Sequence, residues 1–214
     1  MSLRSFAIVV AADLANGIGL NGTLPWRLRK DMAFFAKLTS KTSASSPPSA
    51  INACIMGRKT WESIPQKFRP LTSRLNIIVS RDPHYLDDKP EKSNPHVRLA
   101  SSLEAALSLA ESLHYSVPSA PADQTQVDHI YLIGGAQLYN EGVLSKDCKH
   151  IYLTRVHATV ECDTFFPEIK ESEYTLLPSQ QGHKHLEELL QEPVEGGLIT
   201  EGSFQYEYTV YERK

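Results

Sequence analysis

Short apolar runs rich in β-branched residues recur along the first two thirds of the chain. Their residues are apolar at successive positions instead of alternating with polar ones, which is typical of strands buried on both faces of a parallel sheet. Four runs of this kind are found, at residues 6–12, 53–56, 75–79 and 130–133. We therefore predict a sheet built mainly of parallel strands.

Helical patterns separate these runs. Ser101 and Glu104 have the spacing of a capping box, which predicts the start of a helix. The apolar stripe of this helix consists of Leu103, Ala106, Leu107, Ala110 and Leu113. The alternation of strands and helices predicts an α/β fold with a largely parallel sheet.

The C-terminal part of the chain has a different pattern. Three strand-like segments follow one another at residues 151–158, 174–178 and 203–211, and no long helix is predicted between them. Because consecutive strands without a crossover helix pair antiparallel, we expect an antiparallel edge on the sheet.

Three polar segments are predicted to be surface insertions in a single domain of residues 1–214. They lie near residues 39–50, 115–127 and 182–202, and the third contains a short helical patch. None has enough apolar residues to form a domain of its own, so we expect solvated loops.

The composition narrows the classes of function. Of the 214 residues, 41% are hydrophobic and 22% are charged, as in an ordinary soluble globular protein. A net charge of −3 and the lack of a basic run argue against binding to nucleic acid or to anionic membranes. No signal-type segment and no membrane-spanning run is recognisable. Cys54, Cys148 and Cys162 form no CxxC pair, so we expect free buried thiols in a reducing compartment and no zinc site.

Asp31 is the most informative polar residue. It falls in an apolar stripe with the spacing of one helix face, made of Leu28, Asp31, Met32, Phe35 and Leu38. The rigid corner Leu24-Pro25-Trp26 comes just before it. A buried carboxylate is unfavourable without a partner or a function. Two interpretations stay open: an anchor for a flat, nitrogen-rich heterocycle, or a structural ion pair with an arginine.

Three predicted strands end in residues that suit phosphate groups. In open α/β sheets, ligands bind outside the carboxyl ends of the strands. Cations, hydroxyls and glycines at these ends can hold anions together with the free amides of a following helix. The three groups are Arg58, Lys59 and Thr60, then Ser80 and Arg81, and then Gly134 and Gly135. Each could separately be a solvated or tight turn, but three together suit a dinucleotide with an extra phosphate.

Two further segments concern the neighbourhood of these sites. Gly17, Gly19 and Gly22 follow the first strand without a helix after them, which indicates either a mobile lid or a plain glycine-rich turn. Thr154 is predicted to share an apolar strand face with Tyr152 and Val156. Its hydroxyl needs a partner there, which is either backbone or water, or the carboxylate of Asp31.

Taken together and in this order, these segments resemble the dihydrofolate reductase family. The resemblance covers residues 7–167 and the terminal strand at 204–213. Its most specific parts are Gly17 to Trp26, Met56 to Trp61, Ile133 to Gly135 with Tyr139, and Asp163 to Pro167. The last part and the insertions are similar to eukaryotic members, of a fungal or other lower-eukaryotic type. The resemblance implies a mostly parallel eight-stranded sheet with an antiparallel C-terminal edge, flanked by about four helices.

The family implies a role for particular residues on the substrate side. Asp31 matches the acid that binds the pterin amino group and ring N3, and Thr154 matches the threonine that supports it. Arg74 matches the arginine that holds the glutamate α-carboxylate of the substrate. The catalytic positions implied are Asp31, Thr154, Trp26 and Leu24. The substrate-binding positions implied are Val9, Val10, Asp31, Met32, Phe35, Ile64, Leu71, Arg74, Ile133 and Thr154.

On the cofactor side, the family implies NADPH. Ser80 and Arg81 match the site of its 2′-phosphate, the glycine pair and the residues after it match the diphosphate turn, and Tyr139 lies near the nicotinamide. The cofactor-binding positions implied are Ala11, Ile18, Gly22, Gly57, Arg58, Lys59, Thr60, Ser80, Arg81, Gly134, Gly135, Ala136, Gln137, Leu138 and Tyr139. No metal is implied.

The resemblance therefore implies hydride transfer from NADPH to C6 of dihydrofolate, with a proton reaching N5 by way of a water. Burial is expected to raise the pKa of Asp31. We also expect a cytoplasmic monomer that binds folate and antifolate inhibitors and has no fused thymidylate synthase. The alternatives are a related NADPH-dependent reductase of riboflavin synthesis and a non-catalytic nucleotide-binding homologue. Asp31 itself departs from the glutamate of most eukaryotic members, and Met32 departs from the aromatic residue of vertebrate members.

Overall fold

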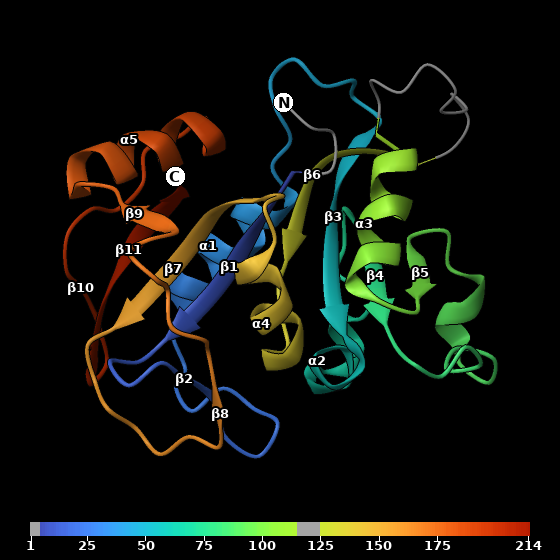
Figure 1. The fold of residues 1–214 in the computed structure, drawn as a ribbon, viewed down its shortest axis with the longest axis horizontal. Coiled ribbons are helices and arrows are strands. Elements are labelled where there is room, and N and C mark those ends of the chain that lie inside the picture. Colours follow the sequence, from blue (N-terminus) through green and yellow to red (C-terminus); the bar gives the residue numbers. More distant parts are fainter. Residues whose placement is uncertain (1–4, 115–124) are drawn as a thin grey trace.

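A computed structural model describes residues 5–114 and 125–214 of the chain. Its centre is one sheet with the strand order β10-β11-β7-β1-β6-β3-β4-β5 (Figure 1). A ninth strand, β9, pairs with the C-terminal end of β11. The strands are β1 (Phe6–Ala12), β3 (Ala50–Gly57), β4 (Arg74–Val79), β5 (Val97–Ala100), β6 (Gln126–Leu132), β7 (Cys148–Val156), β9 (Tyr174–Leu176), β10 (Ile199–Glu201) and β11 (Phe204–Arg213). A separate small pair joins β2 (Gly17–Gly19) to β8 (Thr164–Phe165).

The pairing of the strands agrees with the predicted class. Strands β1, β3, β4, β5, β6 and β7 pair parallel with their neighbours, whereas β11 pairs antiparallel with β7, β9 and β10. The mostly parallel sheet and the antiparallel C-terminal edge are therefore confirmed. Within the described residues, the structure adds β5 and β10 to the main sheet and β2 and β8 as a separate pair, none of which the apolar pattern had indicated.

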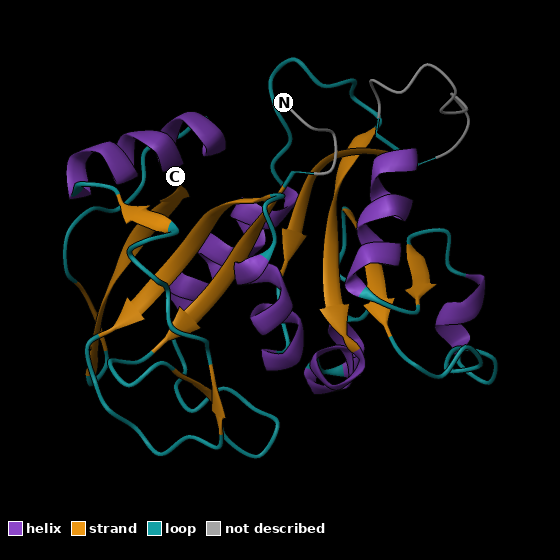
Figure 2. Ribbon diagram, in the orientation of Figure 1, coloured by secondary structure: helices purple, strands orange, loops and turns teal. Residues whose placement is uncertain are grey.

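Helices cover both faces of the sheet (Figure 2). They are α1 (Arg29–Ser40), α2 (Arg58–Ser63), α3 (Leu103–Ser112), α4 (Ala136–Leu144) and α5 (Ser179–Leu190), with short 3-10 helices at Gln66–Phe68 and Pro90–Ser93. Helices α3 and α4 pack on one face, and α1, α2 and α5 pack on the other. Within the described residues, these helices are too short or too polar to span a bilayer.

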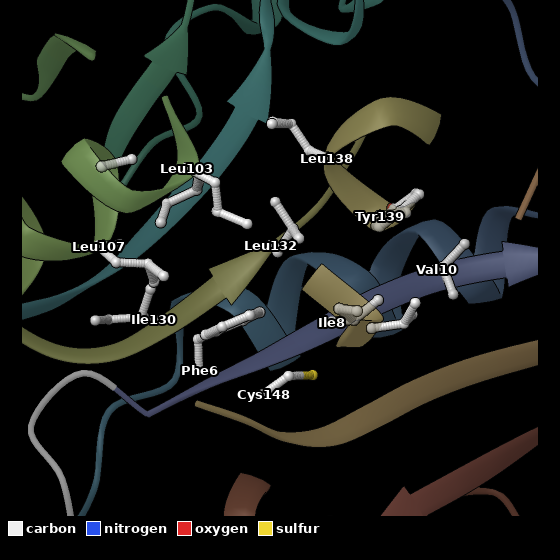
Figure 3. Close-up of a cluster of buried hydrophobic side chains, with 14 of the residues drawn as sticks. Phe6, Ile8, Val10, Leu103, Leu107, Ile130, Leu132, Leu138, Tyr139 and Cys148 are labelled. Carbon is white, nitrogen blue, oxygen red and sulfur yellow. The ribbon is translucent and has the colours of Figure 1, made fainter. Parts of the chain in front are cut away.

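Alternation along the central strands divides the core between the two faces. On β1, Ile8 and Val10 point toward α3 and α4 (Figure 3). Ala7 and Val9 pack on the other face, in the cluster that contains Leu28 and Leu38. Strands with apolar residues on both faces are the ones that the consecutive apolar runs had predicted. This arrangement fixes α1 on the sheet face to which Val9 and Thr154 belong.

The prediction of no long helix between the C-terminal strands was wrong. Helix α5 has 12 residues and lies between β9 and β10. Two of its three leucines, Leu186 and Leu190, are buried in the same cluster as Ile199 of β10. The segment 182–202 is therefore part of the core and not a solvated loop, because its helix packs against β11.

Two smaller predictions also need correction. The first predicted insertion, residues 39–50, is not one loop. Thr39 is fully buried in the last turn of α1, and Ala50 begins β3. The cap of α3 is Ser102, not Ser101, and its hydroxyl accepts the amide hydrogen of Ala105 at 3.1 Å. The insertion predicted at 115–127 lies mostly outside the described residues, apart from the start of β6.

Candidate active site

The carboxylate of Asp31 and the hydroxyl of Thr154 meet beneath the first turn of α1. Asp31 is 6% exposed and Thr154 is 5% exposed. The hydroxyl Oγ1 of Thr154 donates a hydrogen bond of 2.7 Å to Oδ1 of Asp31. Thr154 is held in place because β7 lies between β1 and β11, where it pairs with Ala11 and Tyr208. Among the described residues, Asp31 has no arginine or lysine partner, so the structural ion-pair interpretation is wrong.

The electrostatic setting of Asp31 favours its protonated form. Burial raises the pKa of this carboxyl from 3.8 to about 6. The hydrogen bond from Thr154 opposes the rise, and the negative charge of Glu201 adds to it. Asp31 can therefore change its protonation state near neutral pH, as groups in active sites often do.

A cavity of about 330 Å³ opens in front of Asp31. It is lined by Leu24, Trp26, Arg27, Leu28, Arg29, Asp31 and Met32. Leu24 is 48% exposed and Met32 is 49% exposed, so two large apolar side chains face an open space. The apolar stripe of α1 is thus only partly a core face, and its Met32 lies beside the cavity.

Trp26 lines this cavity and has an unpartnered polar atom. Its side chain is 6% exposed, and its indole Nε1 is buried with no hydrogen-bond partner among the described residues. An unpaired buried donor is unfavourable unless a water or a ligand atom accepts from it. The cavity therefore has one acceptor, the Asp31 carboxylate, and Trp26 beside it keeps a donor that no described residue uses.

The other residues predicted for the substrate walls lie on the same side of the sheet, with one exception. Val9, Phe35 and Ile133 pack in the cluster that contains Trp26. Ile64 and Leu71 pack with Ile133 in the neighbouring cluster around Trp61. The side chain of Val10 points to the opposite face, so only its backbone is available to a ligand on the Asp31 side.

Arg74 is a buried cation without an acidic partner among the described residues. It is 6% exposed at the start of β4. Its Nη1 donates to Oγ1 of Thr39 at 2.7 Å, and its Nε donates to the carbonyl of Thr72 at 2.9 Å. Burial lowers the pKa of the guanidinium. A buried arginine held only by neutral groups has donors to spare for an anionic ligand.

The carboxyl ends of β3 and β6 approach each other very closely at their glycines. The amide of Gly57 donates to the carbonyl of Gly134 at 2.8 Å. A Cβ on Gly134 would lie 2.8 Å from Oγ1 of Thr60, and one on Gly135 would lie 3.1 Å from it. Gly134 also has φ +139°, which side chains rarely allow. These glycines therefore allow the two strand ends and Thr60 to approach one another more closely than larger residues would.

Cations and hydroxyls directly follow the ends of β3 and β4. Gly57 and Gly135 precede the first turns of α2 and α4, whose free amides point to the same edge. Arg58, Lys59 and Arg81 form no ion pair with another described residue, and Ser80 follows β4 directly. Gln137 is exposed on α4, while Leu138 is buried against the Gly57 turn. Together these groups could hold a dinucleotide with several phosphates.

The remaining predicted cofactor positions are Ala11, Ile18, Tyr139 and Gly22, and they differ in their surroundings. Ala11 is paired with Thr154 across β1 and β7, which places the end of β1 beside the Asp31 site. Ile18 is partly buried against the core. The hydroxyl of Tyr139 donates to the carbonyl of Val9 at 2.8 Å, so it is already used within the protein. Gly22 lies in open space at φ +74°.

The glycine-rich segment is fastened to the chain after β7. Gly19 accepts from the amide of Asp163 at 3.0 Å, and the amide of Asn21 donates to Oδ2 of Asp163 at 2.7 Å. Asp13, fully buried, accepts from the amides of Gly17 and Val160 at 2.7 and 2.9 Å. The segment is thus held over the end of β1 at two points.

Sequence reasoning missed three groups around Asp31. The ring of Phe34 stacks on Tyr208 with centroids 3.9 Å apart. Burial and the nearby charge of Asp31 raise the pKa of Tyr208. Glu201 accepts from the first amides of α1. Only the alternation of Tyr206, Tyr208 and Val210 on β11 could have indicated that one of these faces the site.

The comparisons with known proteins agree with this geometry. A family model described as dihydrofolate reductase matches residues 5–191. The chain belongs to the dihydrofolate reductase family. It is 38% identical over 221 residues to the dihydrofolate reductase of Candida albicans, and 33% identical over 213 residues to that of Heliothis virescens, with 100% of every chain covered.

A solved structure has the same fold. The Schistosoma mansoni dihydrofolate reductase matches with a TM-score of 0.70 and 31% identity, over 97% of each chain. The family reduces dihydrofolate with a nicotinamide cofactor, and this chain is an oxidoreductase of that kind. Its relatives include eukaryotic proteins from fungi, insects and plants.

Proposed function

We propose that the protein reduces 7,8-dihydrofolate to 5,6,7,8-tetrahydrofolate with NADPH and so supplies one-carbon metabolism. The observation that carries this proposal is the Asp31 carboxylate, which is buried, bonded to Thr154 at 2.7 Å and open to a cavity on its other side. A pterin ring has adjacent ring and amino N–H donors, and a carboxylate accepts from two such donors at once.

The two ends of the substrate fit two separate features of the cleft. Asp31 would accept from the pterin, and Nε1 of Trp26, which has no partner among the described residues, would donate to a water beside the substrate. Arg74 would hold the glutamate α-carboxylate of the tail with the donors that Thr39 and Thr72 do not use. The residues between them, Met32, Phe35, Ile64 and Leu71, would contact the apolar middle of the molecule.

The groups at the strand ends fit NADPH. The free amides at the start of α4, after Gly134 and Gly135, would bind the diphosphate, and Arg58, Lys59 and Thr60 would lie beside it. Ser80 and Arg81 would hold the 2′-phosphate and so favour NADPH over NADH. When bound, NADPH supplies the hydride that the substrate accepts at C6.

The residues of the chain contribute alignment and proton supply. Asp31 holds the pterin in one orientation, and the apolar walls keep bulk water from the reacting atoms. The carboxyl binds the ring on the side away from N5, so a water has to carry the proton to N5. With a pKa of about 6, Asp31 can promote protonation of the pterin near neutral pH.

We further propose that the enzyme works as a cytoplasmic monomer of lower-eukaryotic type and that antifolates with a pterin-like ring bind beside Asp31. The 38% identity to the Candida albicans enzyme supports the type. Asp31 in place of a glutamate shortens the side chain by one methylene, and Met32 widens the entrance, so antifolate selectivity should differ from that of vertebrate enzymes.

The function is tested by following NADPH oxidation with dihydrofolate and repeating it with NADH. We expect turnover with NADPH and a KM for NADH higher by at least about tenfold, because two charge-assisted contacts are lost. Asp31→Asn should keep NADPH binding and lower dihydrofolate turnover about 100-fold. Normal turnover by Asp31→Asn, or a preference for NADH, would contradict the roles of Asp31 or of Ser80 and Arg81.

A further inference from the structure

Helix α1 has no cap of its own. The residue at its N-cap position, Leu28, makes no side-chain hydrogen bond to the helix. The first amides of a helix are left without partners unless an outside group accepts from them. Asp31 lies in this first turn, so the placement of its carboxyl depends on how the turn is held.

Glu201 supplies the missing cap from the far end of the chain. Its Oε1 accepts from the amide of Arg29 at 2.6 Å, and its Oε2 accepts from the amide of Lys30 at 3.0 Å. These charge-assisted bonds also place a negative charge at the positive end of the helix dipole. The hydroxyl of Tyr206 lies 3.5 Å from Oε2 and donates to the same carboxylate.

The position of Glu201 is fixed by the pairing of two strands. In the β10–β11 pair, Glu201 lies opposite Phe204 and Ile199 lies opposite Tyr206, with Gly202 at φ +62° in the turn. Ile199 and Tyr206 are buried in the same cluster as Trp26 and Leu28. The packing of Ile199 and Tyr206 in the core therefore positions the carboxylate of Glu201 at the start of α1.

Three acidic residues of the segment 191–202 contact α1 at different points along the helix: Glu192, Glu195 and Glu201. Lys37 pairs with Glu192 at 2.6 Å and Lys30 pairs with Glu195 at 3.0 Å, all with well-exposed side chains. Exposed ion pairs of this kind contribute little. Of the three, Glu201 alone bonds to the helix backbone, and it alone acts on Asp31 electrostatically.

We propose that Glu201 is a positioning residue for Asp31: it fixes the first turn of α1, directs the Asp31 carboxyl toward the substrate, and keeps a negative charge beside it. The proposal rests on the function proposed above for its effect on catalysis, but the effect on Asp31 itself does not depend on any substrate. Glu201 would thus act on the reaction through Asp31, without touching the pterin.

Other charged or titratable groups also face this region. They come from α1, β11 and the 191–202 segment, and they are Arg29, Lys30, Tyr206, Tyr208 and Glu195. Hydrogen bonds from Arg29 and Lys30 lower the pKa of Glu201 against the opposite effect of burial, so its charge is present where Asp31 titrates. A Glu201 substitution leaves these other groups in place.

The test compares Glu201→Gln with Glu192→Gln, which removes the same charge from the same segment at the other end of α1. The Asp31 carboxyl is titrated by ¹³C NMR in the ligand-free protein and assigned with Asp31→Asn. We expect its midpoint to move to lower pH in Glu201→Gln and to stay unchanged in Glu192→Gln. In steady-state assays, the KM for dihydrofolate should rise about fivefold in Glu201→Gln with a smaller change in kcat.

A third variant separates geometry from charge. Glu201→Asp keeps the charge but shortens the side chain, so the Asp31 midpoint should stay closer to that of the unmodified protein while the KM still rises. An unchanged midpoint and KM in Glu201→Gln, or the same changes in Glu192→Gln, would overturn the proposal. If the protein does not reduce dihydrofolate, the proposed function fails, and the NMR titration still decides the inference. If Glu201→Gln does not fold, Glu201→Asp with a normal KM overturns it and with a raised KM supports it.

Discussion

Thr39 in the last turn of α1 accepts a hydrogen bond of 2.7 Å from Arg74 at the start of β4. Thr39 is fully buried, and its hydroxyl also donates to the carbonyl of Phe35 at 2.7 Å. The end of α1 therefore holds the guanidinium, while the beginning of α1 carries Asp31. One helix fixes the distance between the two polar anchors of the proposed substrate.

Thr39→Val should weaken the binding of the substrate's glutamate α-carboxylate by Arg74. Removing the hydroxyl leaves Nη1 of Arg74 without its acceptor, so the guanidinium loses its fixed direction. We expect the KM for dihydrofolate to rise about fivefold with kcat nearly unchanged, because the contact is equally strong in ground and transition states. A dihydropterin without the glutamyl tail serves as the control substrate, and an equal loss with it would contradict the role of Arg74.

Trp26→Phe tests the unpartnered indole nitrogen. The variant removes Nε1 and part of a buried ring, so it should lose about 1 kcal/mol of stability, and kcat/KM for dihydrofolate should fall about tenfold. Trp61→Phe is the control, because Trp61 is fully buried and its Nε1 also has no partner among the described residues, yet Trp61 does not line the cavity beside Asp31. The control should lose similar stability in urea unfolding and keep its KM for dihydrofolate. Equal effects on that KM would contradict the interpretation.

The parts of the fold and site that the sequence predicted depend on short-range patterns. Consecutive apolar residues identified the central strands, and the phosphate-type residues follow those strands directly. The strand alternation placed the Thr154 hydroxyl on the face of Tyr152 and Val156, and the helix spacing directed Asp31 to a buried position. A bond between Asp31 and Thr154 could be suggested because both lie on faces that their own segments define.

The parts that escaped prediction depend on distant pairings. Thr39 was assigned to a polar loop because nothing near it in sequence shows that Arg74 lies against it. Helix α5 has only two buried leucines, and it is helical because it packs on β11, where Gly182 lies against Val210. Glu201 caps a helix about 170 residues away in sequence. No local pattern contains such a contact.

Gly134→Ala tests the close approach of Gly134 to Thr60 at the strand ends. The new methyl group would lie 2.8 Å from Oγ1 of Thr60, at a backbone φ of +139°. We expect a loss of about 2 kcal/mol in stability and a rise of about tenfold in the KM for NADPH. Gly182→Ala is the control, since its methyl group would meet Val210 at an ordinary 3.6 Å within a helix, and it should stabilise the protein by about 0.5 kcal/mol. Urea unfolding and cofactor titration measure both, and a normal NADPH affinity in Gly134→Ala would exclude a diphosphate there.

The raised pKa of Asp31 makes a prediction about stability as well as activity. Its carboxyl has a pKa of about 6 in the folded protein, above the ordinary value of 3.8, so the folded state binds this proton more tightly than the unfolded state. The stabilisation by the proton is fully present below pH 3.8 and is lost as the pH rises through about 6. Above that pH range, the ionised carboxylate of Asp31 lowers the free energy of unfolding.

The stability gained by Asp31→Asn over the unmodified protein should therefore be about 2 kcal/mol larger at pH 8 than at pH 4.5, because Asp31 in the folded protein is ionised at pH 8 and mostly protonated at pH 4.5. The asparagine oxygen can still accept the hydrogen bond from Thr154, so the comparison isolates the charge. Urea unfolding of both proteins at the two pH values measures the difference, with Asp87→Asn, at an exposed carboxyl paired with Lys92, as the control for a general charge effect. A difference between the two proteins that is the same at pH 8 and pH 4.5 would show that burial does not raise the Asp31 pKa. A larger gain at pH 8, together with lost turnover, would show that this carboxylate is kept for catalysis at the expense of stability.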